Sequence, residues 1–460
     1  MFKYTSQYIP QCKALERFEL AAMMQIANVA AILPVVTSYG PAQYSCVLEG
    51  SDTYYYDSEE TIYKRLFQDL KEAVEWLKDF RDSSPSQDLL DDFKRADKVC
   101  DGDIDKWIKF ANTLRLRIAM QLVKVYPDSQ KEAEDAVRDG VLTNSDSDVV
   151  LKSGLMLFRI EDLWNDTRAN ANIISILQGY SDPRLERWFA TNNADIYSTD
   201  DELSPVVEKA TKYLGVRQGV PMTRTEYQGY SKTSRVGIPE QGPRPVLRVA
   251  EAYFLRAEGM LRNWNMGDGT PESLYNEGIH SAWASVLGDE SGWAGTYESY
   301  INGFINTEEG GDFDWELFEG GFGSAPYINY RNQEYNYYIE ENGKQVGINR
   351  ISVRWHDEDS PEKKLQRIIT QKWISFFPTL SSVAWTEYRR TGYPKLIPIP
   401  SDLNYSNGAI DTELQIRRLP FTQSEYRGNT EEVNKALGLL KGPDNGGTRL
   451  WWDVDKGNFE

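Results

Sequence analysis

Apolar residues recur every three or four positions through long stretches of the first and last thirds of the chain. One such stripe covers residues 62–77 and another covers residues 104–122. This spacing places the apolar side chains on one face of a helix, so both stretches are predicted to be amphipathic helices. Asp57 with Glu60 is typical of a capping box before the first helix, and Asp103 is typical of the N-cap of the second.

The same periodicity returns later in the chain. A pair of helices is predicted over residues 247–261 and 274–287, with Thr270 as N-cap and Pro271 in the first helical position of the second helix. Another helix is predicted to begin at Ser360-Pro361. Paired helices joined by short turns resemble tetratricopeptide-type units, although the full repeat signature is absent from the sequence.

Between these helices the sequence is irregular. Residues 151–166 carry strand-like apolar runs, and residues 191–242 contain many scattered Gly, Pro, Ser and Thr residues that are typical of long loops. No linker separates the parts, so we expect one mostly α domain over residues 1–460. Its helical scaffold is expected at about 1–140, 247–287 and 360–392, and its loop-rich face at about 150–246 and 288–358.

One apolar segment, residues 20–36, raises the question of a membrane span. It is shorter than the roughly 20 residues that cross a bilayer, it contains Gln25 and Asn28, and it reaches Pro34. We therefore expect a buried helix. The first twelve residues have no basic run followed by an apolar stretch, so they are not predicted to be a secretory signal.

Charge and metal-binding residues narrow the possible partners. The 460 residues include 51 Lys and Arg against 70 Asp and Glu, a net charge of −19. This acidity argues against nucleic acid and against binding to anionic lipid through a basic patch. The sequence has no CxxC pair and no HExxH, so we expect no metal and no cofactor. Asp101, Asp103 and Asp105 alternate as in a calcium loop, but Lys106 stands where glycine is needed, which favours helix capping.

The sequence gives no positive case for catalysis. It contains no GxSxG elbow, no GxxxxGK[ST] loop and no GxGxxG motif. His280 and His356 each lack a patterned partner. Acidic residues are so abundant that a carboxylate pair for glycoside hydrolysis has no specific signal. We therefore expect a binding protein and not an enzyme.

The sharpest functional signal is a loop segment rich in aromatic residues. Residues 293–338 contain 13 aromatics in 46 residues, more than twice the 12% share of the whole chain. Sugars stack their apolar faces on aromatic rings while polar side chains bind their hydroxyls. The alternative is that these rings pin long loops to the body as small satellite cores. The candidate stacking residues are Trp293, Tyr297, Trp315, Tyr327, Tyr330 and Tyr338, with Arg331 and Asn332 as polar neighbours.

Several strings, in order along nearly the whole chain, carry a resemblance to a known family. The most characteristic are WIKFANTLRLR at residues 107–117, AEAYFLRAE at 250–258 and AWTEYRRTGYP at 384–394. Others lie at residues 36–41, 370–374, 418–429 and 448–453. Together they resemble the SusD/RagB family of outer-membrane nutrient-binding lipoproteins, in particular its starch-binding branch. These residues look like scaffold, so they identify the fold and not the ligand.

The resemblance implies an α-rich fold in which tetratricopeptide-type helix pairs support an irregular, loop-built binding face. It implies capture of an oligosaccharide, or in some members a peptide, at the cell surface of the outer membrane without catalysis. The ligand is then delivered to a SusC-type TonB-dependent transporter, over which the protein closes like a lid. Family members carry a lipid-modified cysteine, but Cys12 lacks a lipobox, so we expect no lipid anchor on this chain.

Two other hypotheses stay open from the residues alone. One is an α-helical glycoside hydrolase with a carboxylate pair in a cleft lined by the same aromatics. The other is a helix-repeat adaptor that binds only its membrane partner. Tyr54, Tyr55 and Tyr56 are further loop aromatics whose part in a binding site is left open.

Overall fold

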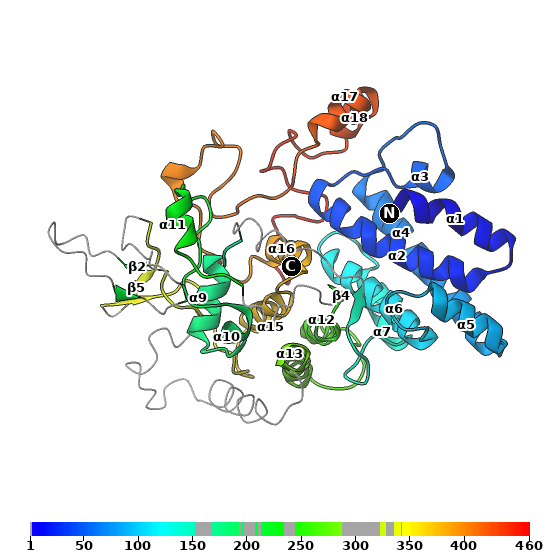
Figure 1. The fold of residues 1–460 in the computed structure, drawn as a ribbon, viewed down its shortest axis with the longest axis horizontal. Coiled ribbons are helices and arrows are strands. Elements are labelled where there is room, and N and C mark those ends of the chain that lie inside the picture. The colour runs from blue at the N-terminus through cyan, green and yellow to red at the C-terminus, as the bar shows by residue number, and fades with distance from the viewer. Residues whose placement is uncertain are drawn as a thin grey trace.

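The structure is a computed structural model, and most of its described residues lie in packed helices (Figure 1). It describes residues 2–151, 167–192, 195–196, 208–209, 213–233, 244–287, 323–327, 335–341 and 343–460. The mostly α class predicted from the sequence is confirmed.

The N-terminal third forms a layer of helices. It contains α1 (Phe2–Ala14), α2 (Phe18–Tyr39), α3 (Ser45–Glu49), α4 (Glu59–Asp82), α5 (Gln87–Ala96), α6 (Ile104–Gln121) and α7 (Ser129–Arg138). Helix α2 packs against α1 and α4, and α6 packs against α4 and α7. The apolar stripes of α4 and α6 both face the main hydrophobic core, as their spacing predicts.

Helix α2 is a core element. It runs through Pro34 and is longer than the apolar segment that the sequence suggests. It is the one helix in the described ranges whose length and composition would allow it to cross a membrane, and 61% of its most apolar window is buried inside the protein. This burial agrees with the expected buried helix.

The capping prediction was right for α6 and wrong for α4. Asp103 accepts a hydrogen bond from Lys106 N at 2.9 Å, as expected for an N-cap. At α4 the cap is Ser58, whose Oγ accepts from Thr61 N. Asp57 lies one residue too early and instead accepts from Ser45 N at 2.7 Å, at the start of α3.

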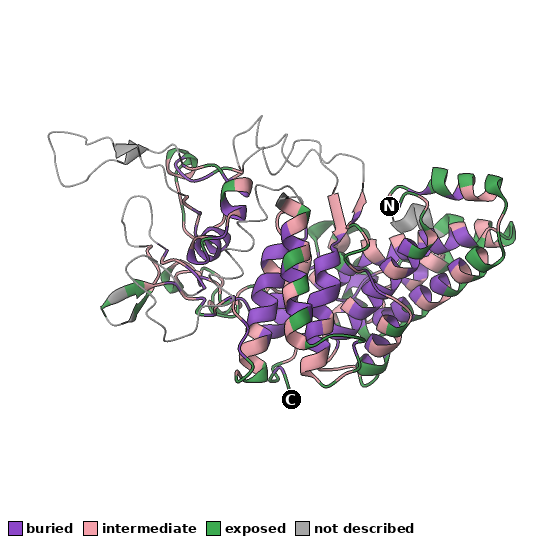
Figure 2. Ribbon diagram, turned by 90° about the horizontal axis from the view of Figure 1, so that it is seen from below, coloured by how far each residue is buried: buried purple, intermediate pink, exposed green. Residues whose placement is uncertain are grey.

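The central helices form the second half of the body. They are α12 (Val249–Leu261), α13 (Pro271–Leu287), α15 (Pro361–Ser375) and α16 (Ser381–Thr391). Helix α12 contacts α13, α15 and α6, so it joins the two halves. The predicted cap of α13 is present, since Thr270 Oγ1 accepts from Ser273 N at 3.1 Å. Figure 2 shows that buried residues concentrate in this packed helical body.

The remaining elements are short. They are α9 (Ala171–Gly179), α10 (Arg184–Trp188), α11 (Arg224–Gln228), the 3₁₀ helix η2 (Ser401–Leu403), α17 (Gln423–Gly428) and α18 (Thr430–Leu437). Three antiparallel two-stranded ribbons pair β1 (Val149–Leu151) with β4 (Arg244–Leu247), β2 (Asp195–Ile196) with β3 (Glu208–Lys209), and β5 (Ile339–Glu341) with β6 (Lys344–Val346). Of the strand-like stretch predicted at 151–166, only Leu151 lies within the described residues, at the end of β1.

Candidate functional site

The strings that carry the family resemblance supply the charged core of the scaffold. Arg390 of α16 donates to both carboxylate oxygens of Glu258 on α12, at 2.6 and 2.7 Å, and to Glu387 at 2.6 Å. Lys372 of α15 lies 3.1 Å from Glu387. Their side chains are at most 2% exposed. Burial alone would raise the pKa of Glu258, but the adjacent Arg390 and Arg262 lower it below its ordinary value.

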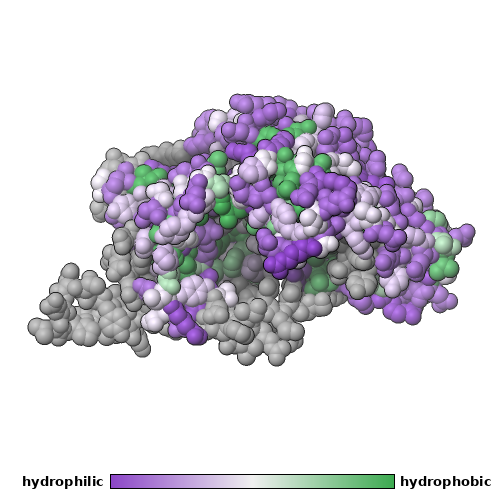
Figure 3. Space-filling view, turned by 90° about the horizontal axis from the view of Figure 1, so that it is seen from above, coloured by the Kyte–Doolittle hydropathy of each residue, from purple (hydrophilic) through white to green (hydrophobic). Residues whose placement is uncertain are grey.

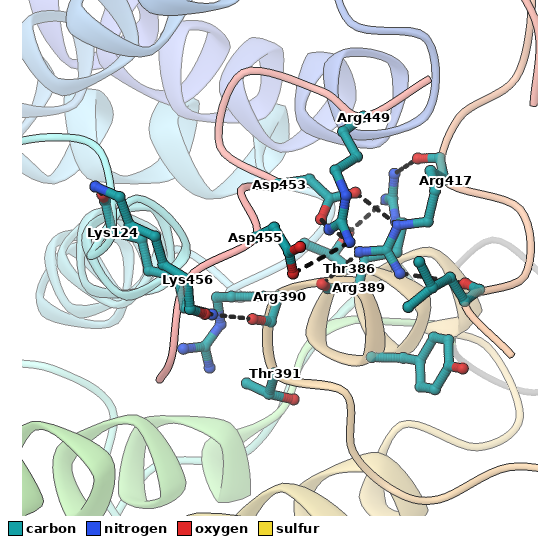
Figure 4. Close-up of polar contacts among 12 residues, drawn as sticks. Lys124, Thr386, Arg389, Arg390, Thr391, Arg417, Arg449, Asp453, Asp455 and Lys456 are labelled. Atoms are coloured by element: carbon teal, nitrogen blue, oxygen red, sulfur yellow. Dashed lines mark hydrogen bonds and ion pairs between the residues drawn. The ribbon is translucent and has the colours of Figure 1, made fainter. Parts of the chain in front are cut away.

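A second cluster fastens the C-terminal segment to α16 (Figure 4). The guanidinium of Arg389 lies 3.6 Å from the ring centre of Trp385 and 4.8 Å from that of Trp452. Arg417 donates to Asp453 and, at 2.6 Å, to the carbonyl oxygen of Arg389. These residues are therefore committed to holding the fold, which agrees with the expectation that the hallmark strings are scaffold.

The loop-rich face is anchored by Arg217, which the sequence did not single out. Its side chain is nearly buried, and it donates to the carbonyl oxygen of Pro398 at 2.9 Å and to that of Tyr335 at 2.8 Å. Its guanidinium carbon also lies 5.1 Å from the ring centre of Tyr337. Burial lowers the pKa of Arg217. One arginine thus ties together three segments that are distant in sequence.

Two neighbouring segments of this face pair through Tyr327 and Tyr337. Each backbone N–H donates to the carbonyl oxygen of the other at 2.9 Å. The side chain of Tyr327 packs with Ala171 and Ile397 in a small core of its own. Burial raises the pKa of Tyr327. The ring therefore pins loops together in this structure, as the alternative interpretation of the loop aromatics describes.

Helix α9 supports this face from below through direct contacts. Ala325 N donates to Ser175 O at 2.8 Å, and Asn349 N donates to Ser324 Oγ at 2.9 Å. At the end of α9, a Cβ on Gly179 would lie only 2.4 Å from Ser324 Cα. Because the two backbones pass this closely, only glycine fits there without a shift. The described base of the face is therefore fixed by contacts in which backbone atoms take part.

Two of the eight candidate ligand residues, Tyr327 and Tyr338, lie within the described part of the chain. The other six lie outside it: Trp293, Tyr297, Trp315, Tyr330, Arg331 and Asn332. Tyr327 is buried in the small core, and Tyr338 is half-buried just before β5. The assignment of these eight residues to ligand binding stays a prediction.

The other loop tyrosines lie at a different part of the molecule. Tyr55 donates to Glu49 at the end of α3 at 2.8 Å. Tyr56 donates to Glu425 of α17, and its ring centre lies 5.3 Å from that of Phe421. In Figure 1, α3 and α17 lie on the side of the N-terminal helices, whereas α9 and α11 lie on the opposite side.

Comparison with known proteins agrees with this architecture. The sequence matches the SusD-like family, described as "Susd and RagB outer membrane lipoprotein", over residues 2–297 and 322–453. No curated protein matches the chain.

Solved structures extend the likeness to almost the whole chain. A chitin-binding SusD homologue from Flavobacterium johnsoniae is 35% identical, with a TM-score of 0.78, and the match covers 96% of this chain and 82% of that one. A SusD homologue from Bacteroides uniformis is 30% identical, with a TM-score of 0.79 and coverage of 99% and 85%. A SusD-like protein from Bacteroides thetaiotaomicron is also 30% identical, with a TM-score of 0.75 and coverage of 95% and 82%.

The helical scaffold, its buried ion pairs and these matches lead to one conclusion. The chain belongs to the SusD-like family of outer-membrane lipoproteins.

Proposed function

We propose that the chain captures an oligosaccharide at the cell surface of the outer membrane and passes it on chemically unchanged. The observation that carries this proposal is its 35% identity, over 96% of its length, to a SusD homologue that binds chitin. The aromatic-rich residues 293–338 supply the side-chain types that sugar recognition needs.

The scaffold suits capture because it holds in place the parts of the loop-rich face that the structure describes. Arg217, α9 and the close contact at Gly179 fix the base of that face through backbone atoms. A preorganised face loses less conformational entropy when a ligand binds, so fewer contacts are needed for a given affinity. The buried carboxylates Glu251 and Glu258 belong to ion pairs of the helical scaffold, which is support for a binding role over a catalytic one.

We take chitin oligosaccharides, chains of β-linked N-acetylglucosamine, as the first ligands to test. Calorimetric titration should give saturable heat with at least one member of a panel of chitin, plant and host oligosaccharides. Continuous heat release with formation of new reducing ends would instead support a glycoside hydrolase. Binding of peptides in place of every sugar would support a peptide-binding member of the family.

The placement of the ligand site needs its own test. Replacing Trp315→Ala together with Tyr330→Ala should weaken the affinity for a confirmed glycan at least about tenfold, because two stacking surfaces are lost. Tyr8→Ala, which removes a half-exposed ring on α1, is the matched control. Unchanged affinity in the double variant would move the site away from residues 293–338.

The proposed receiver of the ligand is a SusC-type TonB-dependent transporter. This step rests on family membership, because the family is described as outer-membrane lipoproteins. Co-purification of the chain with such a transporter from solubilised outer membranes is the expected result. Recovery of the chain without any transporter would contradict delivery and leave capture standing.

A further inference from the structure

Tyr405 is a candidate contact that neither the sequence patterns nor the family resemblance indicates. Its side chain is 80% exposed, more than any other large hydrophobic residue that the structure describes. Exposed single rings are common on protein surfaces, so exposure alone carries no function. The backbone that presents this ring and the residues around it make the case.

The loop that carries Tyr405 is rigidly held. Asn404 Nδ2 donates to Ile410 O at 2.7 Å, and Ile410 N donates to Ser406 Oγ at 3.0 Å. The loop also lies against Gly447, where an added Cβ would come within 1.7 Å of Ala409 O. The ring is therefore presented from a fixed backbone, which lowers the conformational cost of using it for binding.

This loop continues from the loop-rich face. Ile397 N donates to Asn172 Oδ1 of α9 at 2.7 Å, and Pro398 O accepts from Arg217. The segment is coloured orange on the upper side of the molecule in Figure 1. Figure 3 views that side and shows small apolar areas on a mostly polar surface. Tyr405 is thus tied to the same anchors as the proposed glycan face.

The segment that carries the ring also presents apolar and acidic side chains to solvent. Leu414 is 43% exposed and Ile416 is 39% exposed. The exposed charged side chains of residues 396–416 are all acidic: Asp402, Asp411 and Glu413. The two arginines that follow are buried, and they pair with Asp453 and Asp444.

Such a surface discriminates between classes of sugar. The ring and the aliphatic side chains match the C–H face of a pyranose, and carboxylates accept hydrogen bonds from hydroxyl or ammonium groups. Carboxylated or sulfated sugars would meet like charges, which is unfavourable. The surface therefore fits uncharged or amine-bearing sugars.

We propose that Tyr405 forms a second saccharide contact, selective for uncharged and amine-bearing sugars, at the edge of the loop-rich face. This inference rests on the proposed capture of glycan and adds a residue and a charge preference to it. The sugar stacks on the exposed ring, while Asp402 accepts its hydroxyl or ammonium hydrogens.

The test compares polymer binding by four variants. Depletion from solution by chitin and by chitosan, its deacetylated and amine-bearing form, is measured for the unaltered chain, Tyr405→Ala, Asp402→Asn and two controls. The controls are Tyr8→Ala, an exposed ring on α1, and Glu431→Gln, an exposed carboxyl on α18. Thermal melting checks that each variant is folded.

We expect Tyr405→Ala to weaken binding of both polymers by about three- to tenfold, because one stacking surface is lost. Asp402→Asn should weaken binding of chitosan more than binding of chitin. Both controls should bind like the unaltered chain, and polygalacturonate, which carries carboxylates, should not bind.

The outcomes separate this inference from the proposed function. If the unaltered chain binds glycans and Tyr405→Ala binds as Tyr8→Ala does, the second contact is overturned and capture stands. If Glu431→Gln weakens chitosan binding as much as Asp402→Asn does, the charge preference belongs to the whole acidic protein and not to this loop. If the unaltered chain binds no glycan at all, both proposals fall.

Discussion

Glu59 shows how a single residue can make the stability of this protein depend on pH. It is the first residue of α4, its side chain is buried, and its Oε2 accepts a hydrogen bond from Trp451 N at 2.9 Å. Burial raises the pKa of Glu59 from 4.5 to about 7, although the hydrogen bond from Trp451 and the positive charge of Arg389 act in the opposite direction.

The raised pKa of Glu59 determines whether the protein becomes more or less stable as pH rises. Between about pH 4.5 and 7 the folded chain holds a proton at Glu59 that the unfolded chain has released. The free energy of unfolding therefore falls as pH rises through this window, by at most about 3 kcal/mol. Below the window the full stabilisation is present, and above the window it is lost.

Glu59→Gln should remove this dependence. The amide keeps an oxygen for Trp451 N and carries no charge, so the variant should be more stable than the unaltered chain at pH 8 and similar to it at pH 4.5. Urea unfolding at the two pH values measures the difference. Glu60→Gln changes the neighbouring exposed carboxyl and serves as the control. A Glu59→Gln variant that is equally destabilised at both pH values would show that the carboxyl stays ionised.

Local capping chemistry is only partly predictable from single residues. Asp103 is the only strong cap former directly before its helix, and the prediction there is confirmed. Before α4, Asp57 and Ser58 are adjacent and both able to cap, so the sequence does not decide between them. Ser58 is the N-cap in the structure, because the carboxylate of Asp57 already accepts a hydrogen bond from Ser45 N.

At the level of secondary-structure elements, α12, α15 and α16 are joined by the buried ion pairs of Glu258, Glu387, Arg390 and Lys372. Removing one member leaves opposite charges buried without compensation. Glu258→Gln should therefore lower the free energy of unfolding by about 3–5 kcal/mol at pH 7.

The control for this change is Glu431→Gln, which breaks an exposed pair with Lys435 and should leave stability almost unchanged. Chemical denaturation of both variants in parallel is the measurement. Equal, small losses in the two variants would mean that the three helices are held by apolar packing and not by the ion pairs.

Long helices were predictable from recurring apolar residues, and short helices were not. Helices α4, α6, α12, α13 and α15 each have at least 13 residues, so their apolar side chains recur often enough to show the helical period. Helix α9 has only nine residues and all but one of them are buried, so its sequence shows little contrast between a polar and an apolar face. Helices α10, α11 and α17 have five or six residues, which is too few for a periodic pattern.

For the molecule as a whole, the sequence predicts the fold better than the ligand. The resemblance-bearing strings cover nearly the full length of the chain, and their charged residues, such as Arg390 and Asp453, are buried in the scaffold. Arg217 and Tyr405 belong to irregular segments, where position depends on contacts between distant residues and leaves no periodic signal. The family can therefore be predicted from the sequence, whereas the position of the binding face is indicated only by the aromatic-rich residues 293–338.

The most direct test of capture without chemistry is equilibrium dialysis of the purified chain against a chitin hexasaccharide, with the sugar recovered and sized afterwards. We predict saturable uptake by the protein compartment and a recovered sugar that is still a hexasaccharide. Shorter fragments in the recovered sugar would contradict a binding role and favour a hydrolase. Other oligosaccharides are tested in the same way. If neither chitin hexasaccharide nor any of them accumulates with the protein, glycan capture itself is contradicted.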